Sequence, residues 1–415
     1  MPAKGSALAP TPCPAGVVAG AHCLTGVDAF GAFVLIAVPK DWNGVLVLHA
    51  HGGPELGPPR AERGVADLKR WSVMVKAGYA WAGTTFRQGG VAVRPAAEDI
   101  ERLRLIFKGA VGAPKLTILH GQSWGASVAA RAAEFYPKSF DGVLLSSGVL
   151  GGGSRSYDFR LDLRVVYQAI CANHPAPGEP AYPLWQGLPP DSKLTRPQLA
   201  ERVDACTGVR HPAAQRTAEQ QRKLDTLLRV VRIQERSLIP HLDWGTWHFQ
   251  DIAFNRLQGG NAFGNAGAHY VGSDDDEALN RKVLRYRADP DAARRFADDT
   301  DPSGDIKVPV LTIHAIDDPT AFVELESAFH DRMAAAGHAG NLVQTFTSEH
   351  EHSYLSDPEY AALMEALLDW VQKGTKPTPA SVAARCRADE ARVGPGCQFV
   401  EDYAPPALAE RVTPR

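Results

Sequence analysis

A pentapeptide, Gly121-Gln122-Ser123-Trp124-Gly125, stands between an apolar run and an amphipathic run and constrains the fold more than any other feature of the chain. We predict a strand over Lys115–His120 and a helix over Trp124–Phe135. The flanks of a tight strand-to-helix turn come so close together that only glycine fits two residues before and two residues after its central residue. The pattern therefore predicts a chain of the α/β class in which a buried strand turns sharply into a helix at Ser123.

A turn of this kind suits a nucleophilic serine. A serine hydroxyl is a poor nucleophile, and the turn exposes its oxygen while the first N–H groups of the helix point at the charge that develops during attack on a carbonyl. We therefore predict that Ser123 is the catalytic nucleophile. The alternative interpretation is a glycine-flanked turn with an incidental serine.

The chain offers donors for an oxyanion hole after an earlier strand. Val45–Ala50 is predicted as a strand, and His51-Gly52-Gly53-Pro54 follows it directly. Glycines in such a loop allow the backbone to approach a substrate carbonyl. We predict that the backbone N–H groups of Gly53 and Trp124 are the two donors. The alternative is a simple turn at the end of a strand, which glycines mark by default.

An acid is expected at the end of a later strand. The segment Val308–Ile316 is predicted as a strand, and it ends in Asp317 and Asp318. A carboxylate at the C-terminal end of a strand lies on the edge where open α/β sheets place their sites. We choose Asp318 as the acid because the turn begins at Asp318-Pro319, and Asp317 stays an alternative one residue away.

Two histidines follow the next predicted strand, Leu342–Phe346, in a polar loop that precedes a helix starting near Asp357. We predict that His352 is the general base, with its second ring nitrogen donating to the aspartate, and that His350 is the alternative. A His-x-His pair is also compatible with a metal site. No third ligand cluster with suitable spacing accompanies this pair, so we predict no metal and no cofactor.

The order of these residues resembles that of the α/β-hydrolase superfamily, with His51-Gly52-Gly53, the pentapeptide around Ser123, Asp318 and His352 in family order. The resemblance spans roughly residues 30–150 and 305–375. It implies a mostly parallel central sheet flanked by helices, with a largely helical lid insertion. It also implies a serine hydrolase that works through a Ser-His-Asp triad and an acyl-enzyme.

Two narrower resemblances compete. Val38–Gly44 and the closing run Leu368–Gly374 look like secreted bacterial esterases of the tannase and feruloyl-esterase type. His51–Pro54 together with Ser123-Trp124-Gly125 resembles proline iminopeptidases, but Glu55 and Gln122 depart from that family's glycines. These departures favour an enzyme that hydrolyses carboxylic esters. An aminopeptidase that uses lid carboxylates such as Asp243 or Asp251, and a non-catalytic binding protein, stay as alternatives.

Charge and hydropathy limit the partners. The 415 residues include 44 lysines and arginines and 47 acidic residues, which gives a net charge of −3. This balance does not favour nucleic acid or an anionic membrane as a partner. No apolar stretch reaches the ~18 residues that a transmembrane helix needs. We expect a small-molecule ester, or a short peptide, as the substrate and leave the oligomeric state open.

Six cysteines fall into three pairs that are close in sequence: Cys13 with Cys23, Cys171 with Cys206, and Cys386 with Cys397. Local pairs of this kind are typical of disulfides in exported proteins. We therefore predict a secreted or periplasmic protein, although the start at Met1 lacks the apolar region of a signal peptide. A cytosolic enzyme with six reduced thiols is the alternative.

Four segments are predicted: residues 1–150 as the first half of the core, 151–303 as a helical lid, 304–375 as the second half of the core, and 376–415 as a Pro-rich tail. Within the first half, residues 1–30 are expected to be loop-rich. Further strands are expected over Gly31–Val38, Tyr79–Thr85 and Gly142–Gly148, and helices over Val65–Ala77 and Ala97–Gly109.

The insertion is expected to determine substrate specificity, because the core supplies only the catalytic residues. Its predicted helices are Pro197–Ala205, Ala213–Ile233 and Asp276–Ala288, the last starting in an acidic run. Among its aromatic residues, Trp244, Trp247 and Phe249 are candidates for the wall of an apolar or aromatic acyl pocket. The alternative is that these aromatic residues form the insertion's own small core.

Overall fold

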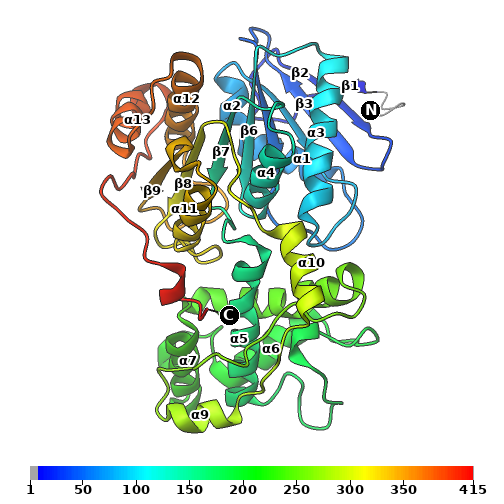
Figure 1. The fold of residues 1–415 in the computed structure, drawn as a ribbon, viewed down its shortest axis with the longest axis vertical. Coiled ribbons are helices and arrows are strands. Elements are labelled where there is room, and N and C mark those ends of the chain that lie inside the picture. The colour runs from blue at the N-terminus through cyan, green and yellow to red at the C-terminus, as the bar shows by residue number, and fades with distance from the viewer. Residues whose placement is uncertain (1–7, 415) are drawn as a thin grey trace. The chain divides into compact units, whose positions relative to one another are not determined.

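The computed structural model describes residues 8–414, and contacts between residues divide the chain into two units. The core unit consists of the chain up to Gly152 together with Asp299–Pro406. The second unit consists of Gly153–Asp298 together with the residues from Ala407 onward. The strands lie in the core unit, whereas the second unit is built from helices and loops (Figure 1).

A mostly parallel sheet forms the middle of the core unit. Its strands are β1 (Ala9–Thr11), β2 (His22–Val27), β3 (Phe33–Val38), β4 (Val45–Ala50), β5 (Ala80–Thr84), β6 (Leu116–Gln122), β7 (Gly142–Ser146), β8 (Val310–Ala315) and β9 (Leu342–Thr347). Their spatial order is β1-β2-β3-β5-β4-β6-β7-β8-β9. The first four strands in this order pair antiparallel, and all pairs from β5 to β9 are parallel. Parallel strands need cover on both faces, which explains apolar runs such as that of β4.

Helices supply that cover. The helices of the core unit are α1 (Glu62–Arg70), α2 (Ser72–Lys76), α3 (Val93–Ala110), α4 (Trp124–Phe135), α11 (Leu325–Ala335), α12 (Asp357–Lys373) and α13 (Pro379–Val393). Side chains of α3, α4 and α11 pack on one face of the sheet, and those of α1, α2, α12 and α13 pack on the other. The predicted fold class, a mostly parallel sheet flanked by helices, is therefore confirmed.

The predicted strands of the core agree with the structure to within two residues, but three other predictions need correction. Residues 1–7 lie outside the described residues, and the rest of the expected loop-rich lead contains β1 and β2. The residues of these two strands are exposed or half-exposed except for Cys23, so they lack the regular alternation of apolar and polar positions that predicts a strand. The helix predicted over Val65–Ala77 is broken at the buried Trp71 into α1 and α2. The segment predicted as a tail contains α13.

The second unit is helical, with boundaries that differ from the prediction. Its helices are α5 (Gly152–Cys171), α6 (Arg196–Thr207), α7 (Ala218–Val231), α8 (Leu238–Asp243), α9 (Asp276–Lys282) and α10 (Pro290–Thr300). The single helix predicted over Ala213–Ile233 is wrong, because the Thr217 side chain caps α7 and separates it from a short turn at Ala213–Gln215. The helix predicted over Asp276–Ala288 starts as expected, but it ends at Lys282.

Sequence reasoning missed α5 altogether. Its apolar residues alternate with charged ones, and this spacing hides a helix. The charged side chains are nevertheless buried because they have partners inside the second unit. The Arg164 guanidinium donates to the carbonyl oxygens of Gly187 and Gly245 at 3.1 and 2.5 Å. The Asp162 carboxylate accepts a hydrogen bond of 2.7 Å from the Tyr270 hydroxyl.

The three predicted cysteine pairs are confirmed as disulfides: Cys13–Cys23, Cys171–Cys206 and Cys386–Cys397. Each disulfide closes a short stretch of chain inside one unit.

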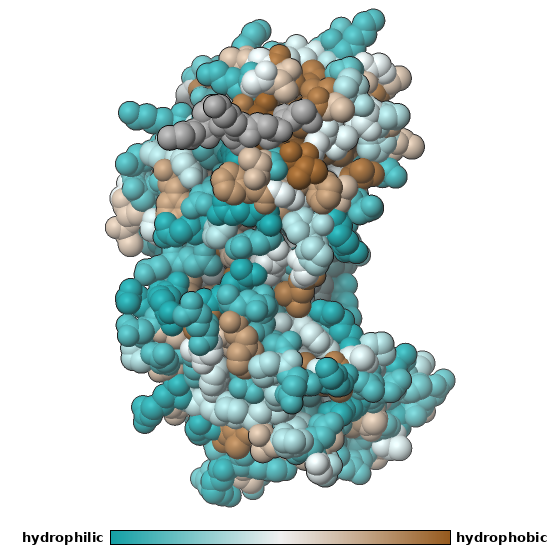
Figure 2. All heavy atoms as spheres, turned by 90° about the vertical axis from the view of Figure 1, so that its right-hand side faces the viewer, coloured by the Kyte–Doolittle hydropathy of each residue, from teal (hydrophilic) through white to brown (hydrophobic). Residues whose placement is uncertain are grey.

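Within residues 8–414, no helix has both the length and the apolar character needed to cross a membrane. Hydrophilic residues cover most of the molecular face that Figure 2 draws, with apolar residues in small areas.

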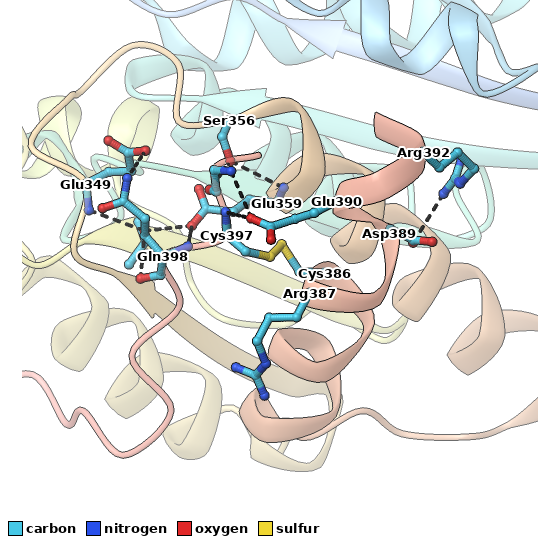
Figure 3. The surroundings of a disulfide bond; sticks show 12 residues. Glu349, Ser356, Glu359, Cys386, Arg387, Asp389, Glu390, Arg392, Cys397 and Gln398 are labelled. Atoms are coloured by element: carbon cyan, nitrogen blue, oxygen red, sulfur yellow. Dashed lines mark hydrogen bonds and ion pairs between the residues drawn. A yellow bond between two sulfur atoms is a disulfide. The ribbon is translucent and has the colours of Figure 1, made fainter. Parts of the chain in front are cut away.

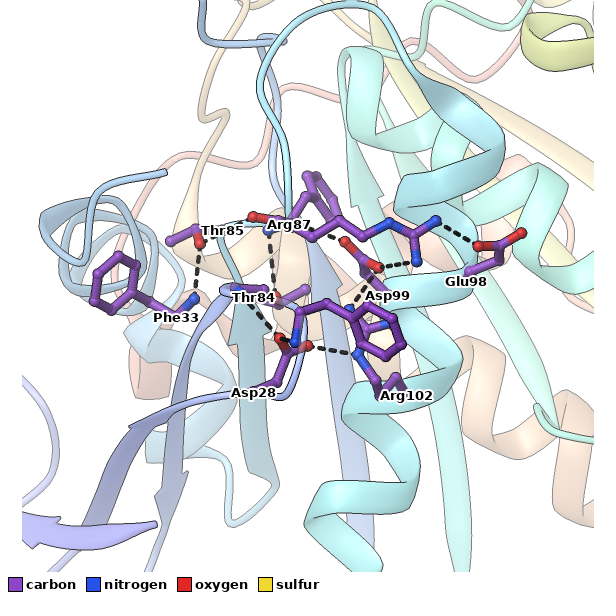
Figure 4. Close-up of polar contacts among 11 residues, drawn as sticks. Asp28, Phe33, Thr84, Thr85, Arg87, Glu98, Asp99 and Arg102 are labelled. Carbon is purple, nitrogen blue, oxygen red and sulfur yellow. Dashed lines mark hydrogen bonds and ion pairs between the residues drawn. The ribbon is translucent and has the colours of Figure 1, made fainter. Parts of the chain in front are cut away.

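A buried network of charges fastens the start of the sheet to α3 (Figure 4). The Arg102 guanidinium donates to Asp28, before β3, at 2.5 Å and to Asp99, on α3, at 2.6 Å. Asp99 also accepts the backbone N–H of Arg87 at 2.6 Å. All three charged side chains of this Arg102 cluster are at most 8% exposed. Asp28 is balanced by Arg102, and Asp99 is balanced by Arg102 together with Arg87, whose guanidinium lies 3.2 Å from Asp99 Oδ1.

We predict that Arg102→Met lowers the free energy of unfolding by about 3 kcal/mol, because it removes the cation that pairs with the buried Asp28 and leaves Asp99 with Arg87 alone. Urea unfolding of the purified variant measures the change. Arg104→Met is the matched control, since Arg104 lies on the same helix but pairs with Glu101 nearer the surface. The control loses less than about 1 kcal/mol. Equal losses of unfolding free energy in the two variants would contradict the stabilising role assigned to Arg102.

Candidate functional site

The turn between β6 and α4 holds Ser123 in a strained backbone conformation, with φ at 57° and ψ at −123°. A positive φ is uncommon for a residue with a side chain and persists only where the surroundings enforce it. Here the Ser123 N–H donates to the Ser146 carbonyl at 2.9 Å, and its own carbonyl accepts the N–H of Val149 at 3.1 Å. Both contacts come from β7 and the residues after it. The neighbouring strand thus fixes the turn.

The two glycines of the pentapeptide are required by close approach. A Cβ atom on Gly125 would lie 2.1 Å from the carbonyl oxygen of Ala50, at the end of β4. A Cβ atom on Gly121 would lie 2.4 Å from the carbonyl oxygen of Gly125. The start of α4 therefore packs directly on the backbone of β4 and β6, as the glycine spacing predicts.

Ser123, His352 and Asp318 form one continuous chain of contacts. His352 Nε2 lies 2.7 Å from Ser123 Oγ, and His352 Nδ1 lies 2.7 Å from Asp318 Oδ2. The Asp318 side chain is fully buried, and its other oxygen accepts the N–H groups of Thr320 and Ala321 at 2.7 and 2.9 Å. The structure thus brings together the three residues that sequence reasoning preferred.

The alternative residues lie together elsewhere. His350 Nδ1 is 3.0 Å from Asp317 Oδ2, and these two side chains are 71% and 54% exposed. They form a surface pair rather than a contact with Ser123. Among residues 8–414, no group of three or more His, Cys, Asp or Glu side chains is arranged to hold a metal ion.

Asp318 is ionised despite its burial. Burial alone raises the pKa of a carboxyl, but the charge of His352 and a hydrogen bond from His314 outweigh that effect. Together they hold the pKa of Asp318 well below its usual range. The ionised carboxylate can accept the His352 Nδ1–H.

The loop after β4 and the first residue of α4 carry the two predicted oxyanion donors. Gly53 has a φ of 68°, and Trp124 opens α4, where a backbone N–H has no carbonyl partner within the helix. The Gly52 carbonyl accepts from the Arg63 guanidinium and lies 3.0 Å from His51 Nδ1. Because a peptide group is planar, these contacts also fix the direction of the Gly53 N–H.

Gln122, the residue before the serine, was not singled out as a site residue by sequence reasoning. Its side-chain Nε2 donates to the backbone carbonyl of His352 at 3.1 Å. It also lies so close to the loop after β4 that a Cβ on Gly52 would be 2.1 Å from its Oε1. Gln122 therefore ties the histidine loop to β6. The only signal for this role in the sequence was the position of Gln122 inside the pentapeptide, directly before Ser123.

A C-terminal segment, Gly396–Val400, holds both ends of the histidine loop (Figure 3). At the first end, the Ser348 N–H donates to the Gln398 carbonyl at 3.0 Å, and the Gln398 side chain donates to Glu349 at 2.7 Å. At the second end, the Ser356 hydroxyl donates to the Gly396 carbonyl at 2.7 Å. The Cys386–Cys397 disulfide ties this segment to α13. The C-terminal part of the chain thus supports the loop that carries His352.

A buried carboxyl lies between the histidine loop and this segment. Glu359, on α12, accepts hydrogen bonds from the Thr347 hydroxyl at 2.7 Å and from the Gln398 N–H at 3.2 Å through Oε1. Its other oxygen is buried with no hydrogen-bond partner among the described residues. Burial raises the pKa of Glu359 to about 7.

The three candidate pocket residues of the second unit have different surroundings. Phe249 is fully buried and stacks on Phe263 at a centroid distance of 4.5 Å, so its ring belongs to the core of that unit. Trp244 is half-buried and stacks on His248 at 4.1 Å. Trp247 is also half-buried, with the Arg196 guanidinium 4.8 Å from its ring centroid.

The fold is similar to that of two solved fungal structures. Feruloyl esterase B from Aspergillus oryzae is 12% identical, with a TM-score of 0.51 over 90% of this chain and 88% of that one. An esterase from Aspergillus oryzae is 13% identical, with a TM-score of 0.51 over 86% of this chain and 80% of that one. At such identities the likeness shows the fold alone, and it confirms the predicted α/β-hydrolase fold.

No protein-family model matches the chain, and no curated protein matches it in sequence. The two structures described above do not show the predicted likeness to proline iminopeptidases.

We predict that Glu359 makes stability depend on pH. The unfolded chain releases this proton near pH ~4.3, whereas the native state keeps it up to about 7, so stability is lost as the pH rises through this window. Relative to wild type, Glu359→Gln should gain up to about 3 kcal/mol between pH 4 and pH 8. Urea unfolding at both pH values measures the difference. A constant difference between the two proteins would contradict the raised pKa.

Proposed function

We propose that this protein is a serine hydrolase that cleaves carboxylic esters through an acyl-enzyme. The observation that carries the proposal is the chain of contacts from Asp318 through His352 to Ser123, each 2.7 Å long. A serine, a histidine and a buried carboxylate in this order are the groups that nucleophilic attack on a carbonyl requires. The fold supports the same proposal, since the serine lies on the turn where α/β-hydrolases place their nucleophile.

In the proposed reaction, His352 Nε2 takes the hydroxyl proton as Ser123 Oγ attacks the ester carbonyl carbon. Asp318 holds the Nδ1–H of His352 and stabilises the imidazolium that forms. When the tetrahedral intermediate collapses, His352 returns the proton to the leaving alcohol, and an ester bond joins the acyl group to Ser123. Water then attacks this ester by the same proton transfers and releases the acid.

The negative charge of the tetrahedral intermediate is proposed to rest on the N–H groups of Gly53 and Trp124. Donors are most effective when they are held in place before the reaction, because they need no reorganisation in the transition state. Arg63 supports this role, since its guanidinium contacts the Gly52 carbonyl and also donates to Asp67 at 3.0 Å and to Glu55 at 3.1 Å. The loop is thereby anchored to α1.

The charges of the second unit favour an ester over the N-terminus of a peptide. An aminopeptidase needs carboxylates that bind a substrate ammonium group. Asp243 pairs with Arg196 at 2.7 Å, and Asp251 pairs with Arg256 at 3.1 Å. Each of these two carboxylates already has a cation as partner, and this gives the aminopeptidase alternative no support.

We further propose that the protein is exported and that Trp244 and Trp247 contribute to an acyl pocket. The three disulfides support export, because disulfides persist in oxidising compartments.

The half-buried Trp244 and Trp247 support a preference for apolar or aromatic acyl groups. The substrate of the similar fungal enzyme named a feruloyl esterase makes hydroxycinnamate esters a sensible first choice for assay.

We predict that Ser123→Ala lowers kcat for p-nitrophenyl butyrate by at least about a thousand-fold, because the nucleophile is lost. Ser127→Ala is the matched control, since Ser127 lies on the same helix and its hydroxyl donates to the Val149 carbonyl at 2.6 Å. That control should keep most of the activity. A fully active Ser123→Ala protein would refute serine catalysis, and a wild type without turnover on any ester would favour a binding protein.

We predict that His352→Ala loses activity to a similar extent, whereas His350→Ala keeps it, because only His352 contacts both Ser123 and Asp318. Initial rates at pH 8 on the same ester compare the two variants. Loss of activity in His350→Ala alone would show that the assigned base is wrong.

We predict hydrolysis of p-nitrophenyl and hydroxycinnamate esters and no release of p-nitroaniline from proline or alanine p-nitroanilides. Parallel assays with Ser123→Ala as the blank measure both activities. Rapid cleavage of the proline anilide that disappears in the blank would instead assign the protein to the aminopeptidases.

A further inference from the structure

A second pair of charged side chains lies behind Asp318, inside the core unit. His314, on β8, and Glu326, on α11, are both fully buried. His314 Nε2 lies 3.5 Å from Asp318 Oδ2, and His314 Nδ1 lies 3.2 Å from Glu326 Oε1. The proposed triad therefore continues from Asp318 through a histidine to a second carboxylate. Nothing in the reaction proposed above uses this pair.

The contacts of His314 determine how many protons its ring carries. Nε2 faces the Ala321 carbonyl oxygen at 2.8 Å as well as Asp318. Nδ1 faces Glu326. A carbonyl oxygen and ionised carboxylates only accept hydrogen bonds, so both ring nitrogens must donate. An imidazole that donates from both nitrogens is an imidazolium with a positive charge.

The other contacts of the two carboxylates agree with this charge. Glu326 Oε2 accepts hydrogen bonds from the Thr312 hydroxyl at 2.8 Å and from the Gln344 side-chain amide at 2.6 Å. Asp318 Oδ1 accepts the two backbone N–H groups described above. Each of these contacts brings a donor to a carboxylate oxygen, so none of them needs a proton on either carboxyl group.

Two opposing effects act on the His314 ring. Burial lowers the pKa of a histidine, whereas hydrogen bonds and charges from Asp318 and Glu326 raise it, and the outcome is a pKa of about 10. The charged groups that face His314 are Asp318, in the loop after β8, and Glu326, on α11. His352 contacts the same oxygen of Asp318, Oδ2, as His314 does.

We propose that His314 is a positioning residue, a permanently charged imidazolium that orients Asp318 and sets the charge felt by His352. The catalytic part of this proposal rests on the proposed function, whereas the protonation of His314 does not. Asp318, His314 and Glu326 together carry one negative charge beside His352. Proton transfer from Ser123 to His352 therefore creates an imidazolium next to a singly charged cluster rather than a doubly charged one.

Two substitutions change this cluster in opposite directions. His314→Gln removes a positive charge beside Asp318, so the acid limb of the kcat/KM profile moves to higher pH. Glu326→Gln removes a negative charge, so the same limb moves to lower pH. A unit charge in a partly polarisable interior changes a neighbouring pKa by about one unit. If His314 had a merely structural role, both substitutions would lower activity, but the acid limbs of the two variants would stay at the same pH.

The pH dependence of kcat/KM for p-nitrophenyl butyrate, measured from pH 4.5 to 9, tests the proposal. His338→Gln is the matched control, because His338 pairs with Asp305 at 2.8 Å at the surface of the same unit and should leave the limb in place. Shifts of about one pH unit in opposite directions for the two cluster variants are expected. Limbs that stay in place, or that move together, would overturn the proposal.

A second measurement needs no activity and uses the full-length Ser123→Ala protein labelled with ¹⁵N-histidine. NMR spectra at pH 8 should contain one buried histidine with protons on both ring nitrogens, and His314→Gln should remove that signal. If His314→Gln does not fold, Glu326→Gln should shift the same signal. A neutral His314 at pH 8 would overturn the proposal, whereas a failure of the proposed function leaves this result unchanged.

Discussion

The close approach of β4, β6 and the start of α4 is the constraint on which the rest of the site depends. Gly125 lies against the Ala50 carbonyl with no room for a side chain, and the turn between these elements forces Ser123 to a positive φ. The hydrogen bonds with Ser146 and Val149 keep it there. Strain of this kind costs about 1–3 kcal/mol and persists because three strands hold it. This conformation places Ser123 Oγ 2.7 Å from Nε2 of His352, which comes from a distant part of the chain.

The parallel order of the strands brings the remaining groups to the same edge. Asp318 follows β8, and the histidine loop follows β9, so both loops leave the sheet on the side where β6 delivers Ser123. Fine positioning then comes from polar contacts between neighbouring loops. Gln122 holds the His352 carbonyl, and the stapled C-terminal segment holds both ends of its loop. The proposed reactivity thus depends on the ends of strands far apart in sequence.

Sequence reasoning predicted the parts of the site that local patterns encode. Glycines around Ser123 reflect a backbone clash, and strand ends at Asp318 and before His352 reflect sheet geometry, so their meeting was predictable. The roles of Gln122, Arg63 and His314 were not predictable. Each depends on a contact with a residue distant in sequence, and nothing local distinguishes His314 from any other polar residue in a buried strand. Helix α5 was missed because its buried charges disguise its period.

The central claim is that Ser123 is a nucleophile activated by His352, and covalent trapping tests it most directly. The full-length protein is treated with a fluorophosphonate, and the modified peptide is located by mass spectrometry. The account predicts one adduct, on Ser123, that is absent from Ser123→Ala and forms far more slowly in His352→Ala. No adduct under conditions that label a known serine esterase, or an adduct on another residue, would contradict it.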